Sequence, residues 1–413
     1  MMWISSGENH DISWMGAATG NRACICNVLR MALGTMDLMY WRTATELTCA
    51  RCRCLRSACT GTIRVPGFLP QILDKNIYDA VDPKLAAKMH KAIAVLQYKE
   101  EGQIIKRHPE YGMEERILLS AIRYDRGTVT IDGKEYPMRD MNFPTVDPAD
   151  PLRLTDEEEE LLHTLELSFR HNTRLHEHVR FLYSNGSMYK CCNSNLLYHG
   201  CIPMTENREF DGLMVGGKMY RGKELMDFID TQVKNAYFLP EDAPEKEACR
   251  DFMWYLWNGA KSPVFGKDKN RSFEHYFIED PEVMRETMNP YYQLSEEEET
   301  CDMILKEFGL PTKGSHIING HMPVKIKSGE TPIRAGGKLF IIDGGLSKAY
   351  QERTGIAGYT LIFNSHHLAL AEHKPFDPER ERTPKVYIVE KMQKRITVAD
   401  TMRARSWRAA SRI

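Results

Sequence analysis

Several features that would assign this chain to a class at once are missing from it. No apolar run reaches the roughly 18 residues that a membrane-spanning helix requires. The N-terminus has no basic stretch followed by an apolar segment, as a signal peptide would have. The formal net charge is only −2, which gives no reason to expect a partner among nucleic acids or membrane surfaces. We therefore expect a cytoplasmic protein.

The sequence also has no internal repeat and no low-complexity linker. Its 413 residues allow two or three domains, or one large core with insertions. The 11 cysteines are odd in number and irregularly spaced, and neighbours such as Cys24 and Cys26 are too close to bridge comfortably. This usage indicates reduced thiols in a cytosolic setting.

One group of cysteines invites a zinc interpretation. The four fall at Cys49, Cys52, Cys54 and Cys59. This spacing lacks the two separated pairs of a zinc finger or zinc ribbon. Zinc-mediated nucleic-acid binding is therefore the weakest of the functional interpretations.

Hydrophobic patterning predicts an α/β or α+β layered core, because strand-like and helix-like segments alternate. A helix is expected to follow Asp82-Pro83, an N-cap with proline in the first turn, and another to follow the capping box of Thr155 and Glu158. Asp132-Gly133 predicts a hairpin turn within 123–140. Further helices are expected over 11–31, 223–236, 245–257 and 296–308. Further strands are expected over 195–198, 315–318, 338–342 and 359–364.

The tripeptide Asn9-His10-Asp11 is the first candidate for chemistry. An amide oxygen can ligate a metal ion without adding charge, and the adjacent imidazole can protonate a leaving group. An aspartate can hold that imidazole in one tautomer. The structural alternative is an ordinary helix N-cap, and for a three-residue pattern taken alone it is the better interpretation.

His199 and His321 each follow a strand-like run, within Tyr198-His199-Gly200 and Asn319-Gly320-His321. Glycine beside a strand-end histidine lets the backbone turn away and leaves room for a ligand. Either histidine alone could equally be a buried core residue. Together with Asn9 they favour a metal site, and mixed nitrogen and oxygen ligation suits Mn²⁺, Fe²⁺ or Zn²⁺.

Basic residues near glycines are candidates for binding a phosphate group. They are Lys218, Arg221, Lys267 and Lys269. For most of them, an ordinary solvated surface position remains the competing interpretation.

These residues lie in long stretches that resemble the class III fructose-1,6-bisphosphatases, a bacterial branch of the calcineurin-like metallophosphoesterases. The stretches include NHDISWMGAATG, LLYHGCIPM, GGKMYRGKELMDF, FMWYLWNGAKSPVFGKDK, HIINGHMPVK, GGKLFIIDGGLSKAYQ and TGIAGYTLIFNS. The resemblance covers roughly 7–40 and 66–400. It implies a β-sandwich flanked by helices, Mn²⁺ as cofactor, and removal of the 1-phosphate from fructose 1,6-bisphosphate, a gluconeogenic step.

The resemblance also implies roles for single residues. Asn9, His199 and His321 would complete the shell of the second of two metal ions. His10 would protonate the leaving group, with Asp11 behind it. The physical logic is a two-metal clamp that activates water and neutralises the phosphoryl oxygens.

Two departures from the family accompany the resemblance. The family's Asp-x-His and Gly-Asp-x-x-Asp-Arg-Gly motifs are expected before Asn9, so we expect an N-terminally truncated chain without the first metal's ligands and with little or no phosphatase activity. Residues 41–65 match the family in no form, and their arginine and cysteine excess indicates a reading-frame slip. The same argument applies to the arginine-rich tail, 401–413.

The expected organisation is therefore in five parts. Residues 1–40 belong to the metallophosphoesterase core, 41–65 form the aberrant segment, 66–185 form a mainly helical insertion, 186–400 form the rest of the core, and 401–413 form the aberrant tail. The alternative to an enzyme is a non-catalytic remnant that binds a metal ion or a sugar phosphate.

Overall fold

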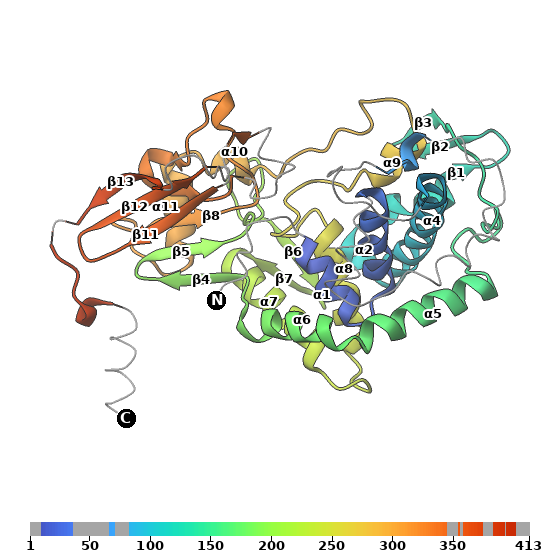
Figure 1. Ribbon diagram of the computed structural model, residues 1–413, viewed down its shortest axis with the longest axis horizontal. Helices are drawn as coiled ribbons and strands as arrows, with labels where there is room; N and C mark the ends of the chain where they lie inside the picture. The colour runs from blue at the N-terminus through green and yellow to red at the C-terminus, as the bar shows by residue number, and fades with distance from the viewer. Residues whose placement is uncertain are drawn as a thin grey trace.

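The computed structural model describes residues 10–35, 66–70, 82–344, 354–355, 358–374, 383–392 and 394–401. Helices and strands gather in two regions, one mainly helical and one built on sheets (Figure 1). The prediction of a mixed α and β fold is thereby confirmed. None of the helices in the described part of the chain combines the length and the apolar character needed to span a bilayer.

The helical region buries one large apolar core. Its helices are α1 (His10–Ala18), α2 (Arg22–Thr35), α4 (Pro83–Arg107), α5 (Asp156–Arg170), α6 (Thr173–Asn185), α7 (Gly222–Phe238) and α8 (Lys246–Asn258). The predicted start signals are confirmed. The Asp82 side chain accepts a hydrogen bond from the Leu85 N–H at 3.1 Å, and Thr155 and Glu158 form the complete capping box of α5. These caps satisfy amide groups that have no partner within the helix.

The single helix expected over 11–31 is wrong, because the chain breaks between α1 and α2. Gly20 has φ of 95°, a conformation that favours glycine and ends the first helix. The Asn21 side chain then accepts a hydrogen bond from the Cys24 N–H at 2.9 Å, which starts the second helix. The break could not be seen in the sequence, because apolar residues continue on both sides of it.

The main sheet has five strands in the order β4-β5-β8-β10-β9. The strands are β4 (Tyr189–Cys192), β5 (Asn195–Tyr198), β8 (His316–Asn319), β10 (Leu339–Ile341) and β9 (Ile333–Arg334). β5, β8 and β10 are parallel, so their carboxyl ends lie at one edge of the sheet. That shared edge is what positions the candidate site.

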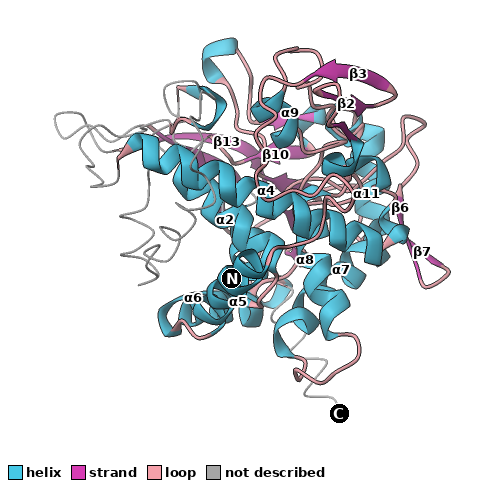
Figure 2. Ribbon diagram, turned by 90° about the vertical axis from the view of Figure 1, so that its right-hand side faces the viewer, coloured by secondary structure: helices cyan, strands magenta, loops and turns pink. Residues whose placement is uncertain are grey.

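A second sheet is formed by β11 (Gly358–Phe363), β12 (His367–His373) and β13 (Lys385–Lys391), all antiparallel. Leu368 and Leu370 of β12 share one core with Ile317 of β8 and Phe340 of β10. Helices α10 (Tyr291–Leu294) and α11 (Glu298–Glu307) complete that core. Figure 2, seen from the helical side, shows α2, α4 and α8 in front of strands β10 and β13.

A three-stranded antiparallel sheet and a two-stranded hairpin complete the fold. β1 (Ile122–Arg123), β2 (Thr128–Ile131) and β3 (Lys134–Pro137) pack with α9 (Ser272–Phe277) around a third core. Their turn residues Asp132 and Gly133 have φ of 50° and 77°, which confirms the predicted hairpin. The other hairpin, β6 (Gly212–Val215) with β7 (Lys218–Arg221), leads directly into α7.

Candidate functional site

His199 and His321 meet at the carboxyl edge of the main sheet. His199 directly follows β5. His321 lies two residues after the end of β8, with Gly320 between them. The two strands are parallel neighbours, and the Gly320 N–H donates a hydrogen bond to the His199 carbonyl at 2.9 Å. The ring centroids lie 5.2 Å apart with the planes at 72°. Two residues far apart in the chain therefore present their imidazoles to one small volume.

The turn after β5 depends on a glycine. A Cβ added to Gly200 would lie 2.4 Å from the Pro263 carbonyl oxygen, which also accepts a hydrogen bond from the Cys201 N–H at 2.9 Å. Any side chain at this position would collide with fixed backbone. The close approach of these two segments therefore sets the direction in which His199 leaves the strand.

A buried polar network lies behind the pair. The Asn319 side-chain amide donates to the Gly200 carbonyl at 3.2 Å and to the Tyr291 hydroxyl at 2.8 Å. The Tyr291 hydroxyl is in turn 2.6 Å from that of Tyr198. Because Asn319 and Tyr198 are the last residues of β8 and β5, this network ties the two strand ends together.

His321 is held in an unusual conformation. Its φ is 64°, in the left-handed region that non-glycine residues rarely adopt. The Tyr292 ring stacks against the imidazole with centroids 6.1 Å apart. Neither ring nitrogen makes a hydrogen bond of good geometry with the described residues, although the Phe265 backbone is close enough to influence the ring. Buried ring nitrogens of this kind are available as ligands.

Burial keeps both histidines uncharged. It lowers the pKa of His199 to about 4. It also lowers the pKa of His321 to about 3, with smaller contributions in the same direction from His199 and Lys267. Each ring therefore keeps a lone pair at neutral pH, as a metal ligand must. The pair fits a divalent ion that accepts imidazole nitrogen, such as Mn²⁺ or Zn²⁺.

The acid Asp343 lies beside the pair and was missed by sequence reasoning. It is only 4% exposed and comes two residues after β10. A Cβ placed on Gly320 would lie 3.7 Å from the Asp343 Cβ and 3.9 Å from the His199 Nδ1. The signal that could have found it is the one that identified His199, a polar residue directly after an apolar strand.

The structure describes only part of the predicted Asn9-His10-Asp11 group. Asn9 lies outside the described residues, and His10 and Asp11 open helix α1. Asp11 in the first turn also suits the positive end of the helix dipole. Within the described part of the chain, no three or more histidine, cysteine, aspartate or glutamate side chains are arranged to hold a metal ion. Of the three predicted metal ligands, the structure therefore describes the two histidines.

Lys267 is the predicted phosphate-binding residue that the structure connects to the histidine pair. Its positive charge helps to lower the pKa of His321. Its ammonium group is 2.5 Å from a carboxylate oxygen of Glu286, and both side chains are about 30% exposed. Lys267 therefore lies next to the candidate site with its charge largely compensated.

The remaining predicted cations have partners elsewhere. Lys218 forms an exposed ion pair with Glu224, and Arg221 is exposed at the end of β7. Lys269 contacts Asp132 in the turn between β2 and β3. The described contacts do not bring these three residues to the histidine pair.

Comparison with known proteins decides the family. A family model described as Firmicute fructose-1,6-bisphosphatase matches residues 3–409. The chain belongs to this family. A class 3 fructose-1,6-bisphosphatase from Clostridium tetani is 47% identical over 373 residues, covering 90% of this chain and 56% of that protein. One from Bacteroides fragilis is 46% identical over 406 residues, covering 95% and 60%. Among solved structures there is no significant match.

The chain thus spans between 56% and 60% of the length of these curated relatives. The family assignment agrees with the resemblance inferred from the sequence stretches around His199 and His321. The proposed frame-shifted segments 41–65 and 401–413 lie outside the described residues, except for Thr401, and stay predictions.

Proposed function

We propose that this chain belongs to a metal-dependent phosphatase that hydrolyses the 1-phosphate of fructose 1,6-bisphosphate. Membership of the fructose-1,6-bisphosphatase family supports the substrate. The single observation that carries the site is the pair His199 and His321, neutral and packed edge to face at adjacent strand ends. Resemblance to the family adds Mn²⁺, a metallophosphoesterase-like sandwich, and a gluconeogenic role in the cytoplasm as parts of the same proposal.

In this proposal His199, His321 and Asn9 hold one divalent ion. A bound ion of this kind supplies positive charge to the phosphoryl oxygens and a more acidic water molecule. The oxygen of water bonds to phosphorus while the bond from phosphorus to the sugar oxygen breaks. His10 donates a proton to that leaving oxygen, and Asp11 holds the imidazole of His10 in the donating tautomer. The products are fructose 6-phosphate and inorganic phosphate.

The test combines turnover with metal binding. The purified chain is incubated with fructose 1,6-bisphosphate and Mn²⁺, and released phosphate is measured beside a His321→Ala variant. The proposal expects Mn²⁺-dependent release that the variant lacks. Phosphate release that is equal in the two proteins would refute the role of the pair.

The second candidate is a non-catalytic module that binds a metal ion or a sugar phosphate. It is favoured by one observation, that the described ligands are two imidazoles without a nearby group of three or more ligating side chains. Two-metal hydrolysis requires more ligands than these. Mn²⁺ binding that depends on His321, without phosphate release, would support this candidate over the enzyme.

A further inference from the structure

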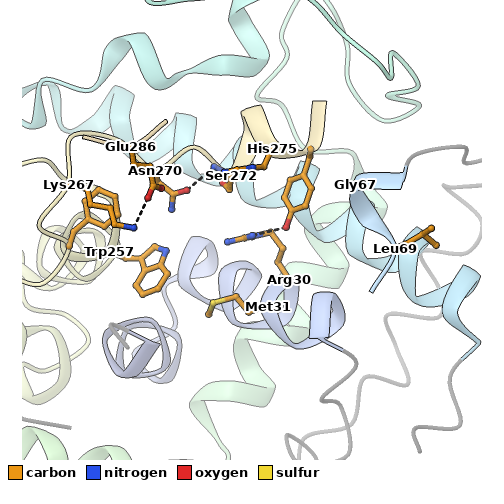
Figure 3. A pocket seen from close by; sticks show the side chains of 12 residues that line it. Arg30, Met31, Gly67, Leu69, Trp257, Lys267, Asn270, Ser272, His275 and Glu286 are labelled. Carbon is orange, nitrogen blue, oxygen red and sulfur yellow. Dashed lines mark hydrogen bonds and ion pairs between the residues drawn. The ribbon is translucent and has the colours of Figure 1, made fainter. Parts of the chain in front are cut away.

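A cavity of about 630 Å³ lies between α2 and the segment that carries Lys267 (Figure 3). Its walls include Arg30, Trp257, Phe265, Lys267, Tyr276 and Glu286. Leu69 at its margin is 54% exposed. The volume is within the range of about 300–1,000 Å³ that small-molecule sites occupy.

Arg30 is an unusual member of this wall. It is 8% exposed, and its described hydrogen bonds all go to neutral groups, Gln97, Tyr276 and Asn27, at 2.7 to 2.8 Å. They use three of the five N–H groups of a guanidinium. Several other buried cations of the described chain contact a carboxylate directly; they include Lys91 with Asp140, Lys99 with Glu158 and Arg116 with Glu274.

The acid that acts on Arg30 does so through an intermediate group. Gln97 accepts from the Arg30 Nε–H through its oxygen and donates to Glu101 at 2.8 Å through its nitrogen. Glu101 also accepts from the Trp254 indole at 3.1 Å. A buried charge without a directly bonded counter-ion is costly, so the cavity beside Arg30 is the place where an anion would be stabilised.

The neighbours of Arg30 fix its orientation and leave its charge intact. The His90 Nδ1 lies 3.2 Å from the Phe68 carbonyl, which can only accept, so that nitrogen carries the proton. The His90 Nε2 must then accept from the Tyr276 hydroxyl at 2.9 Å. Burial, and next the charge of Arg30, lower the pKa of His90 to about 4, so the ring is neutral. The Tyr276 oxygen is left to accept from Arg30.

Two residues of the cavity wall, Phe265 and Lys267, lie near His321. The Phe265 backbone is close to the imidazole, and Lys267 acts on it through its charge. Glu286 compensates Lys267 at 2.5 Å, which leaves the guanidinium of Arg30 as the uncompensated charge of the wall. A ligand with a phosphate at Arg30 could therefore extend toward Lys267 and His321.

We infer that Arg30 binds the phosphate of the substrate that is not hydrolysed, the 6-phosphate of a fructose bisphosphate, within this cavity. The inference rests on the proposed function for its choice of sugar, and on the geometry of Arg30 for its choice of anion. A pre-oriented guanidinium with free N–H groups is suited to phosphate because it offers two parallel hydrogen bonds. Arg30 would then be a specificity residue remote from the reacting atoms.

The test measures binding of fructose 6-phosphate, fructose 1-phosphate and inorganic phosphate by calorimetry, without added metal. Arg30→Gln is expected to weaken fructose 6-phosphate binding at least about tenfold, because a charged hydrogen-bond donor is lost. Fructose 1-phosphate binding should change less than twofold. Arg153→Gln, which neutralises an exposed cation outside the cavity, is the matched control and should bind all three as the unchanged chain does.

Two further measurements guard against misfolding of the Arg30 variant. Arg30→Lys keeps the charge and should bind fructose 6-phosphate with intermediate affinity. Fructose 6-phosphate should change the tryptophan fluorescence of the unchanged chain, because Trp257 lines the cavity. Trp257→Phe should abolish that change, while calorimetry still detects binding. The inference is overturned if the unchanged chain binds no fructose 6-phosphate, or if Arg30→Gln binds it as tightly as the unchanged chain does.

This outcome is separable from that of the proposed function. His321→Ala should lose Mn²⁺ binding and retain fructose 6-phosphate binding. If Mn²⁺ fails to bind while the Arg30 dependence holds, the metal site alone is refuted. If Mn²⁺ binds through His321 while Arg30→Gln has no effect, the cavity inference alone is refuted. Tight binding of inorganic phosphate without preference for the sugar would overturn the choice of ligand.

Discussion

The imidazoles of His199 and His321 stand 5.2 Å apart at 72°, because the parallel strands β5 and β8 end side by side. Neither histidine belongs to a helix or strand. Both side chains are half-buried, and loss of contact with water is the largest cause that lowers their pKa values. The ring nitrogens of His321 are buried and make no hydrogen bond of good geometry with the described residues, which costs free energy. A divalent ion between the two imidazoles would supply His321 with a partner.

The first prediction concerns the metal. His321→Ala should weaken Mn²⁺ binding at least about 100-fold, since even loss of an outer partner of a ligand typically costs 10–100-fold. Electron paramagnetic resonance of free Mn²⁺ in a titration measures this directly. His199→Ala should behave in the same way.

His316→Gln is the matched control for this prediction. His316 lies on the same strand as Asn319 but contacts the Gly337 carbonyl at 2.9 Å and a Glu390 carboxylate oxygen at 2.8 Å. Its replacement should alter stability and leave Mn²⁺ affinity unchanged. Equal loss of Mn²⁺ binding in the His316 and His321 variants would contradict the assignment.

The second prediction concerns the turn after β5. Gly200→Ala should destabilise the protein by about 1–3 kcal/mol, as overpacking in a tight interior does. The new methyl group would lie 2.4 Å from the Pro263 carbonyl oxygen. Gly320→Ala is the control, because its nearest neighbour would lie 3.7 Å away. Urea denaturation that ranks the two variants as equally stable would count against this account of the turn.

The third prediction concerns pH. Burial raises the pKa of Glu100 to about 7, with additions from Glu159 and Asp251 that Arg22 and Arg107 oppose. The folded carboxyl therefore keeps its proton at pH values where the unfolded one, near 4.5, has lost it. The unfolded state binds fewer protons in that window, so stability falls as pH rises from 4.5 to 7.

Glu100→Gln removes this dependence. The variant should equal the unchanged chain near pH 4.5 and exceed it by roughly 3 kcal/mol at pH 8, since one pKa unit is worth about 1.36 kcal/mol. Urea denaturation at several pH values measures the difference. A difference between the two proteins that stays constant across the range would show that Glu100 titrates normally.

The fourth prediction concerns the buried pair Lys99 and Glu158. The Lys99 ammonium is 2.6 Å from the carboxylate, and the side chains are 0% and 5% exposed. Lys99→Met should cost about 3–5 kcal/mol, because it leaves the Glu158 charge buried with less compensation. Chemical denaturation is the measurement. The more accessible pair of Lys234 with Asp230, whose side chains are 42% and 21% exposed, is the comparison, and Lys234→Met should cost about 1 kcal/mol or less.

Local signals in the sequence predicted much of the secondary structure. Three signals act over only a few residues: the Asp82 cap, the capping box of Thr155 and the Asp132-Gly133 turn. Because each depends on neighbouring residues alone, it can be recognised from the sequence. The break at Gly20 escaped because the apolar pattern runs through it. Strand β13 escaped for another reason: its residues 386–389 are all apolar, so no alternation of apolar and polar residues marks it. In the structure, Val386 and Ile388 are 48% and 53% exposed.

The sequence by itself determined which residues carry the candidate chemistry, because histidines after apolar strands and before or after glycine are recognisable one at a time. Only the tertiary structure decided that His199 and His321 meet, that Asp343 lies beside them, and that Arg30 is buried among neutral partners. These relations depend on strand order and on packing between distant segments. Long-range contacts of this kind leave no periodicity in the chain, since each is set by the joint packing of many side chains.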